Sequence, residues 1–267
     1  MIIDNSTIRK EQSLQYDHLL FIHGLGSSAD RWLDIPDALS LLGFHVVALD
    51  LPGFGLSEKP ENMDYTVGQF VQIVARAADK AGIIGSNKKL SIVGHSLGGY
   101  IGAQLAIEYP NLVNKLVLMD TSGMLDGPTP LLRQYLEAAL NPSRQAVRAV
   151  FEQLVADPIR IPDALVDVFI HRMINLQGSK HAFKSAFYNS VYTNIGVENL
   201  KQIGNNDVPV LIIWGRQDRL IPLQHLKIFQ EAIKGSHVVI VEDAGHAPFA
   251  EKPAIACELL HRFFCST

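Results

Sequence analysis

The stretch that decides the fold is Leu90-Ser-Ile-Val-Gly94-His95-Ser96-Leu97-Gly98-Gly99-Tyr100. An apolar run stands directly before a Gly-x-Ser-x-Gly pattern, and a helical pattern follows it. A sharp strand-to-helix turn of this kind would expose the Ser96 hydroxyl at the edge of a sheet. Glycine is needed two residues before and two residues after the serine, because a Cβ there would collide where strand and helix nearly touch. A serine hydroxyl is a weak nucleophile until a base activates it, so a base is expected elsewhere in the chain.

Two later segments share one form: an apolar run, a short turn and then a polar residue. The first is Val210-Leu-Ile-Ile-Trp-Gly215-Arg-Gln-Asp218, and the second is Val238-Val-Ile-Val-Glu-Asp-Ala-Gly245-His246. The carboxyl ends of parallel strands meet at the edge of the sheet where ligands bind. Ser96, Asp218 and His246 also follow one another in the chain in the order that accompanies a Gly-x-Ser-x-Gly turn of this kind. We predict that Ser96 is a nucleophile, His246 its general base and Asp218 the acid that orients His246; Asp120, which ends another apolar run, is the competing acid.

The first apolar run is followed by His23-Gly-Leu-Gly26. Acyl transfer builds negative charge on the former carbonyl oxygen, and two preorganised backbone N–H groups stabilise that charge. One is expected directly after the nucleophile, on Leu97, and the other in this first loop. We predict that Leu25 and Leu97 form the oxyanion hole, and that His23 organises the loop.

Short apolar runs alternate with amphipathic segments, which is typical of a mostly parallel, doubly wound α/β sheet covered by helices. Strands are expected over residues 19–22, 45–49, 90–93, 115–119, 210–214 and 238–241, and helices near 31–42, 66–81, 97–109, 223–233 and 253–264. Between the fourth and fifth strands there are only helix-like segments, near 130–140, 143–155, 163–174 and 180–188, separated by prolines and a glycine. We therefore expect a sheet domain formed by residues 1–122 and 200–267, with an inserted helical cap over 123–199.

Composition excludes several classes of function. The chain has 267 residues and a net charge of −4, with a pI near 6.2, so no nucleic-acid partner is expected. No apolar run is long enough to span a membrane, the first ten residues do not resemble a signal peptide, and a cytoplasmic location is expected.

Cys257 and Cys265 are expected to be reduced, because helical spacing separates them beyond disulfide range. We expect no cofactor and no metal, since no His-x-x-x-His or Cys-x-x-Cys spacing occurs. A monomer and a homodimer both remain open.

These motifs together resemble the α/β-hydrolase superfamily, in its branch of capped serine hydrolases such as carboxylesterases and lipases. The matching segments cover nearly the whole chain in the family's order: residues 23–26, 50–57 (Asp-Leu-Pro-Gly-Phe-Gly-Leu-Ser), 94–99, 215–218 and 245–253. The resemblance implies that the segment from Asp50 to Ser57 is a structural turn near the oxyanion loop. It also implies antiparallel strands before the first parallel one, although little precedes Leu19, so this edge is expected to be short. The expected activity is hydrolysis of carboxylic esters of small or medium-size apolar substrates.

Other activities stay open. Carbon–carbon bond hydrolysis and lactone hydrolysis can use the same three residues, although relatives that cleave carbon–carbon bonds often have asparagine in place of His95. A ligand sensor on a hydrolase scaffold is a non-enzymatic alternative. A dinucleotide-dependent oxidoreductase is a weaker one, because Gly24-Leu-Gly26-Ser-Ser-Ala29 and Asp50 loosely match the fingerprint of that class.

Overall fold

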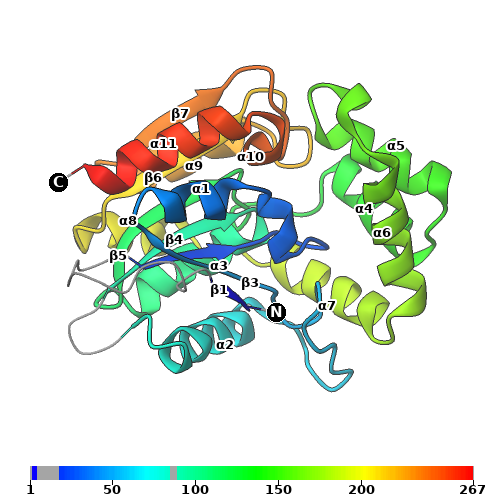
Figure 1. The fold of residues 1–267 in the computed structure, drawn as a ribbon, viewed down its shortest axis with the longest axis horizontal. Helices are drawn as coiled ribbons and strands as arrows, with labels where there is room; N and C mark the ends of the chain where they lie inside the picture. The colour runs from blue at the N-terminus through cyan, green and yellow to red at the C-terminus, as the bar shows by residue number, and fades with distance from the viewer. Residues whose placement is uncertain (1, 5–17, 85–88, 267) are drawn as a thin grey trace.

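The computed structural model describes residues 2–4, 18–84 and 89–266 and shows a seven-stranded sheet in the order β1-β3-β2-β4-β5-β6-β7 (Figure 1). The strands are β1 (Ile2–Asp4), β2 (His18–Ile22), β3 (His45–Leu49), β4 (Leu90–His95), β5 (Val113–Met119), β6 (Val210–Gly215) and β7 (His237–Val241). All neighbours are parallel except β1, which pairs antiparallel with β3. The predicted fold class and all six predicted strands are confirmed.

In the part of the chain that the structure describes, the antiparallel edge consists of β1, which has three residues. No periodicity predicted β1 itself. Residues 1 and 5–17, which include most of the N-terminal segment interpreted above as lacking a signal peptide, lie outside the described residues.

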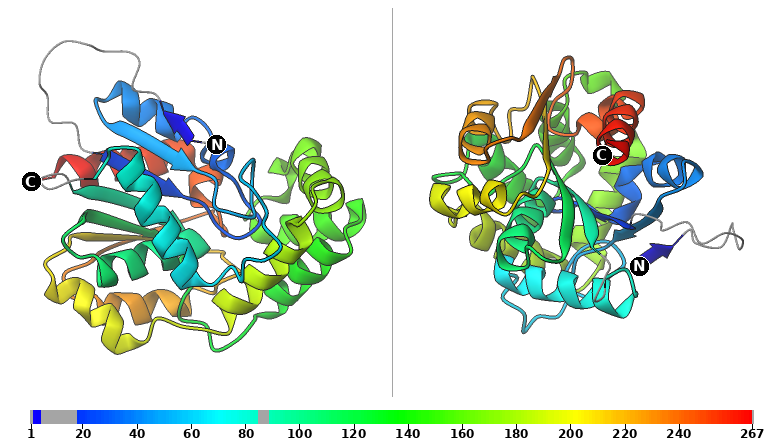
Figure 2. Two further views of the ribbon diagram at one scale, coloured as in Figure 1. Left: turned by 90° about the horizontal axis from the view of Figure 1, so that it is seen from below. Right: turned by 90° about the vertical axis from the view of Figure 1, so that its left-hand side faces the viewer.

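Helices cover both faces of the sheet (Figure 2). Helices α1 (Ile35–Leu41) and α11 (Pro253–Cys265) pack together on one face, over a core that includes Phe21, Trp32 and Leu260. The other face carries α2 (Val67–Lys80), α3 (Leu97–Glu108), α8 (Val197–Asn205) and α9 (Gln224–Ala232), over a core that includes Leu20 and Ile92. Strands buried on both faces read as continuous apolar runs, which is why pattern alone located them. Cys257 and Cys265 are free thiols, both on α11.

One predicted helix differs from the structure. The segment near 31–42 forms a 3₁₀ helix, η2 (Ala29–Trp32), and then α1, with Leu33 between them at a φ of 53°. The break has a local cause, because Pro36 lies in the first turn of α1, where its fixed φ and missing N–H favour a helix start. The break places η2 beside the loop that follows β2.

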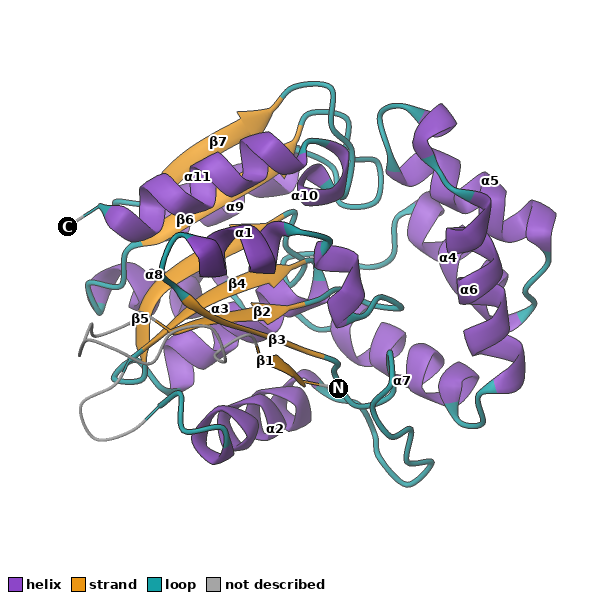
Figure 3. Ribbon diagram, in the orientation of Figure 1, coloured by secondary structure: helices purple, strands orange, loops and turns teal. Residues whose placement is uncertain are grey.

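Four of the helices between β5 and β6 lie beyond the carboxyl ends of the strands (Figure 3). They are α4 (Pro130–Leu140), α5 (Arg144–Leu154), α6 (Asp163–Asn175) and α7 (Ser179–Val191), with a 3₁₀ turn, η3 (Pro158–Arg160), after α5. The four predicted helical segments are confirmed to within three residues at each end. Helix α8 spans the boundary expected at 199/200 and packs on α3 and α9 of the sheet domain. Among the helices of the described ranges, none is long and apolar enough to cross a membrane.

Candidate active site

Ser96 occupies the turn between β4 and α3, at the carboxyl edge of the sheet. Its φ of 53° and ψ of −116° are costly for a residue with a Cβ. Its N–H donates to the carbonyl of Met119 on the neighbouring strand, at 3.0 Å. A Cβ on Gly94 would strike the carbonyl of Gly98, and a Cβ on Gly98 would strike the carbonyl of Ile22 on β2. The spacing of the two glycines therefore has the steric cause inferred from the sequence.

Asp218 and His246 are joined by a hydrogen bond of 2.8 Å between Asp218 Oδ2 and His246 Nδ1. The Asp218 side chain is fully buried, and its Oδ1 accepts from the N–H groups of Leu220 and Ile221 at 2.8 and 3.0 Å. A carboxylate only accepts hydrogen bonds, so Nδ1 of His246 carries the proton and Nε2 is left as the acceptor. This tautomer is the one that a general base requires.

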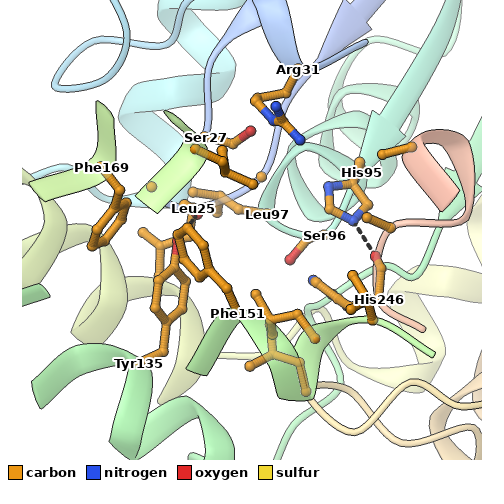
Figure 4. A pocket seen from close by; sticks show the side chains of 18 of the residues that line it. Leu25, Ser27, Arg31, His95, Ser96, Leu97, Tyr135, Phe151, Phe169 and His246 are labelled. Atoms are coloured by element: carbon orange, nitrogen blue, oxygen red, sulfur yellow. Dashed lines mark hydrogen bonds between the residues drawn. The ribbon is translucent and has the colours of Figure 1, made fainter. Parts of the chain in front are cut away.

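Neighbouring groups hold the His246 loop in place. The His246 N–H donates to the carbonyl of Leu154 at 2.6 Å, and His95 Nε2 donates to the carbonyl of His246 at 2.7 Å (Figure 4). Burial, together with the neighbouring His246, lowers the pKa of His95 well below its ordinary value, so His95 is a neutral donor. Glu251 Oε1 accepts from the Gly245 N–H at 2.8 Å.

Asp120, the competing acid, lies near Asp218 but does not bond to His246 in this arrangement. Its Oδ1 accepts from the Gly215 N–H at 2.8 Å, and its buried Oδ2 has no hydrogen-bond partner in the structure. Burial raises the pKa of Asp120 well above its ordinary value, and the charge of Asp218 raises it further. Among the described residues, one group of three side chains could hold a metal ion: Asp120, Asp218 and His246. Two of these side chains, Asp218 and His246, already bond to each other.

The loop after β2 lies beside Ser96, because a Cβ on Gly24 would come within 3.0 Å of the Ser96 Cβ. His23 is buried and bonds to backbone groups: its Nε2 accepts from the Leu51 N–H at 3.0 Å, and its Nδ1 therefore donates to the Gly24 carbonyl at 2.8 Å. In the described part of the chain, neither the Leu25 N–H nor the Leu97 N–H has a hydrogen-bond acceptor. Both residues line the cavity in front of Ser96 (Figure 4).

Asp50 connects two loops. Its Oδ1 accepts from the Ala29 N–H at 2.7 Å and its Oδ2 from the Leu56 N–H at 2.8 Å. The segment that begins at Asp50 is thus a structural turn bonded to the segment that follows β2, as the resemblance implied. In a dinucleotide-binding protein the Asp50 carboxylate would accept a hydrogen bond from a ribose hydroxyl. In this structure it accepts from two backbone N–H groups instead.

A cavity of about 450 Å³ lies between the carboxyl edge of the sheet and helices α4–α7. Ser96 and His246 line it on the sheet side, and Tyr135, Phe151 and Phe169 line it from the helices (Figure 4). Aromatic and aliphatic side chains form most of its wall, which is typical of a small-molecule site.

Sequence reasoning assigned no role to two residues of this site. Glu251 lies in the segment 245–253 that carries the family resemblance, and its carboxylate also accepts the Ala156 N–H at 2.8 Å, so that it links the His246 loop to the segment after α5. Arg172 on α6 donates to Ser28 Oγ at 2.6 Å, an interaction between residues 144 positions apart. No local pattern around Arg172 indicates this contact.

Residues 17–253 match the family described as alpha/beta hydrolase fold. Lipase 3 from Moraxella sp. (strain TA144) is 27% identical over 93% of this chain and 77% of its own length. The dihydrolipoyllysine-residue acetyltransferase component of the acetoin cleaving system from Cupriavidus necator is 34% identical over 88% of this chain, but the match spans 60% of that protein.

Among solved structures, 2-hydroxy-6-oxo-6-phenylhexa-2,4-dienoate hydrolase from Rhodococcus sp. strain RHA1 is 26% identical, with a TM-score of 0.83, over 94% of this chain and 92% of its own length. Its likeness extends through the sheet and the helices beyond it. The family match covers most of the chain and agrees with the sheet order and the strand-to-helix turn at Ser96. The chain therefore belongs to the α/β-hydrolase family.

Proposed function

We propose that the chain is a serine hydrolase that cleaves carboxylic esters of small or medium-size apolar substrates through an acyl-enzyme intermediate. The observation that carries the proposal is the 2.8 Å hydrogen bond between Asp218 and His246, on a histidine that faces the same cavity as Ser96. The lipase among the relatives agrees with this activity.

In the first step Ser96 Oγ attacks the ester carbonyl carbon, and its proton passes to His246 Nε2. The carbonyl π bond becomes an oxyanion, held by the N–H groups of Leu25 and Leu97. When the oxyanion collapses, the bond to the leaving alcohol breaks and His246 protonates that alcohol. Asp218 stabilises the imidazolium that exists between these events.

In the second step a water molecule replaces the alcohol. His246 removes its proton as the water oxygen attacks the acyl carbon, and the same two amides hold the second oxyanion. Collapse releases the carboxylic acid and returns the proton to Ser96 Oγ. No group other than these side chains and amides is required for the proton balance.

We further propose that residues 123–199 act as a cap that selects the substrate. Residues 123–199 supply most of the apolar residues that line the cavity, so exchanging their side chains should alter the preferred acyl or alcohol group without altering the chemistry at Ser96.

The test is hydrolysis of 4-nitrophenyl esters from acetate to laurate by the wild type and Ser96→Ala. We expect turnover that peaks at one chain length and is lost in the variant, which must show an unchanged circular dichroism spectrum. Turnover that persists in Ser96→Ala would overturn the assignment of the nucleophile.

Carbon–carbon bond hydrolysis is the second candidate, because the dienoate hydrolase has the same overall structure. The same series separates the two. A wild type that leaves every ester intact, reacts with a fluorophosphonate at Ser96 and cleaves a 2-hydroxy-6-oxo-dienoate would replace the ester proposal with this one.

A further inference from the structure

The cavity beside Ser96 is mostly apolar, but four charged side chains line it: Asp30, Arg31, Arg172 and Glu251. Three of the four are engaged with partners of their own. Glu251 accepts from backbone N–H groups, and Arg172 pairs with Asp30 at 3.6 Å. Their charges are therefore offset within the protein.

Each carboxylate oxygen of Asp30 contacts a residue other than Arg31. Its Oδ1 accepts a short hydrogen bond from the Ser28 hydroxyl, and its Oδ2 faces Arg172. Ser28 Oγ in turn accepts from Arg172. The cluster of Ser28, Asp30 and Arg172 is closed on itself and links η2 to helix α6.

Arg31 stands outside this cluster. Across the described ranges, no carboxylate comes within ion-pair distance of its guanidinium, and it has no hydrogen-bond partner. Its side chain is partly buried and points toward the cavity in Figure 4, on the side opposite Tyr135. Burial lowers the pKa of Arg31, with Asp30 opposing and Arg172 adding to the effect, as expected for a cation that has lost hydration and lies near a second cation.

A guanidinium is the side chain best suited to a carboxylate, because its fork of N–H groups matches the two oxygens. A cation in an apolar wall without an ion-pair partner costs free energy, and binding of an anion offsets that cost. One guanidinium matches one carboxylate in charge and in number of donors. The wall around Tyr135, Phe151 and Phe169 suits the apolar remainder of such a molecule.

We propose that Arg31 binds a carboxylate carried by the substrate, so that the preferred substrates are amphipathic esters with one apolar part and one anionic end. This inference rests on the proposed ester hydrolysis and narrows its substrate class. The anionic end lies on the η2 side of the cavity, and the apolar part lies against helices α4–α6.

A binding experiment tests the site without depending on turnover. Monomethyl adipate and dimethyl adipate differ by one negative charge at nearly equal length. Their dissociation constants are measured by calorimetry in the Ser96→Ala background, which prevents hydrolysis, with Arg31 intact and as Arg31→Gln and Arg31→Lys. Arg133→Gln is the matched control, because Arg133 is an exposed arginine of α4 that does not line the cavity.

We expect monomethyl adipate to bind about tenfold more tightly than the diester, the range of one charge-assisted hydrogen-bond pair. The preference should disappear in Arg31→Gln, persist at least in part in Arg31→Lys and be unchanged in Arg133→Gln. A preference that survives in Arg31→Gln would place the carboxylate at another group, such as the amides near Ser96, and would overturn the proposal. Equal binding of both compounds by the parent protein would overturn it as well.

Kinetics then separate this inference from the proposed function. With 4-nitrophenyl butyrate and mono(4-nitrophenyl) glutarate, Arg31→Gln should lower kcat/KM about tenfold for the glutarate, through KM, and leave the butyrate within about twofold. An equal loss for both esters would mean that Arg31 only supports the loop. If the parent protein cleaves neither ester yet keeps the charge preference in binding, the ester proposal fails and the carboxylate site stands.

Discussion

The carboxyl groups of Asp120 and Asp218 lie side by side beneath His246, with one atom from each of the three side chains within 4.8 Å of the others. Two ionised carboxylates this close, both buried, would repel strongly. Burial and the charge of Asp218 both raise the pKa of Asp120. Burial and Asp218 therefore both favour the neutral form of Asp120, which leaves Asp218 as the acid that pairs with His246.

The pair predicts opposite results from the same substitution. Asp120→Asn replaces a neutral carboxyl by a neutral amide of equal size, so kcat at pH 7.5 should stay within about threefold of wild type. Asp218→Asn removes the acceptor that fixes the tautomer of His246, and kcat should fall by about 10⁴, as such a change does in a well-studied serine protease. Ester hydrolysis by the two purified variants decides the matter. A comparable loss in both would show that the two acids share the charge.

Asp120 also predicts how stability varies with pH. Because its pKa is raised in the folded protein, its contribution is fully present below the unfolded value and is lost as pH rises through the folded one. Asp120→Asn cannot ionise, so its Tm should rise relative to wild type as pH increases from 4 to 9. Asp126→Asn, at an exposed position, should show no such trend. A Tm difference between Asp120→Asn and wild type that is flat over this range would count against a protonated Asp120.

Much of this candidate site could be predicted from sequence, because it depends on features that are visible in short segments of the chain. The strands are continuous apolar runs, and register aligns their carboxyl ends: Ile22 pairs with Gly94, and His95 pairs with Met119. Residues that follow such runs must therefore reach one edge. Ser96, Asp218 and His246 are predicted in this way, and the glycines around Ser96 follow from the close approach of strand and helix.

The remaining features depend on contacts between distant segments. Whether His246 pairs with Asp120 or Asp218 is a matter of a few ångströms, which no pattern encodes. The bond from Arg172 to Ser28 and the bond from Ala156 to Glu251 join α6 and the segment after α5 to the sheet domain. Their existence depends on how the helices dock, and helical periodicity does not fix that. Strand β1 is too short for an alternating pattern to stand out.

His95 predicts loss of stability in mild acid. Its pKa is lowered well below the ordinary value in the folded protein, so the stability that it contributes is present above pH 6.5 and is lost as pH falls toward the folded value. His95→Gln keeps an N–H donor for the carbonyl of His246 but cannot take up a proton. The drop in Tm between pH 7 and pH 5 should be smaller in this variant than in wild type.

The control for His95 is an exposed histidine, His171 on α6, whose replacement by glutamine should leave the pH profile unchanged. His23 also has a lowered pKa, caused mainly by burial, so His95→Gln should reduce the acid sensitivity without abolishing it. An equal drop in Tm for His95→Gln and wild type would mean that protonation of His95 does not cause the loss of stability in acid.

Replacing Glu251 should increase the mobility of His246 without removing a group that takes part in the proposed reaction. Its two oxygens accept N–H groups from Gly245, Ala247 and Ala156, and Gly245 and Ala247 flank His246. In Glu251→Gln one oxygen becomes a donor that faces other donors, at a cost of about 1–3 kcal/mol for each N–H left unsatisfied. Both Tm and kcat should fall, with KM changing less.

A merely structural role for Glu251 would lower Tm and leave the base intact. The decisive readout is therefore the rate at which a fluorophosphonate labels Ser96 at 20 °C, where the variant is still folded, because labelling needs His246 as base. We expect labelling about tenfold slower in Glu251→Gln, in line with the loss seen when a supporting residue misplaces a catalytic group. Glu242→Gln is the matched control, since Glu242 lies just after β7, is exposed and pairs with Arg216. Labelling at the wild-type rate in Glu251→Gln, with Tm lowered, would restrict Glu251 to stabilising the fold.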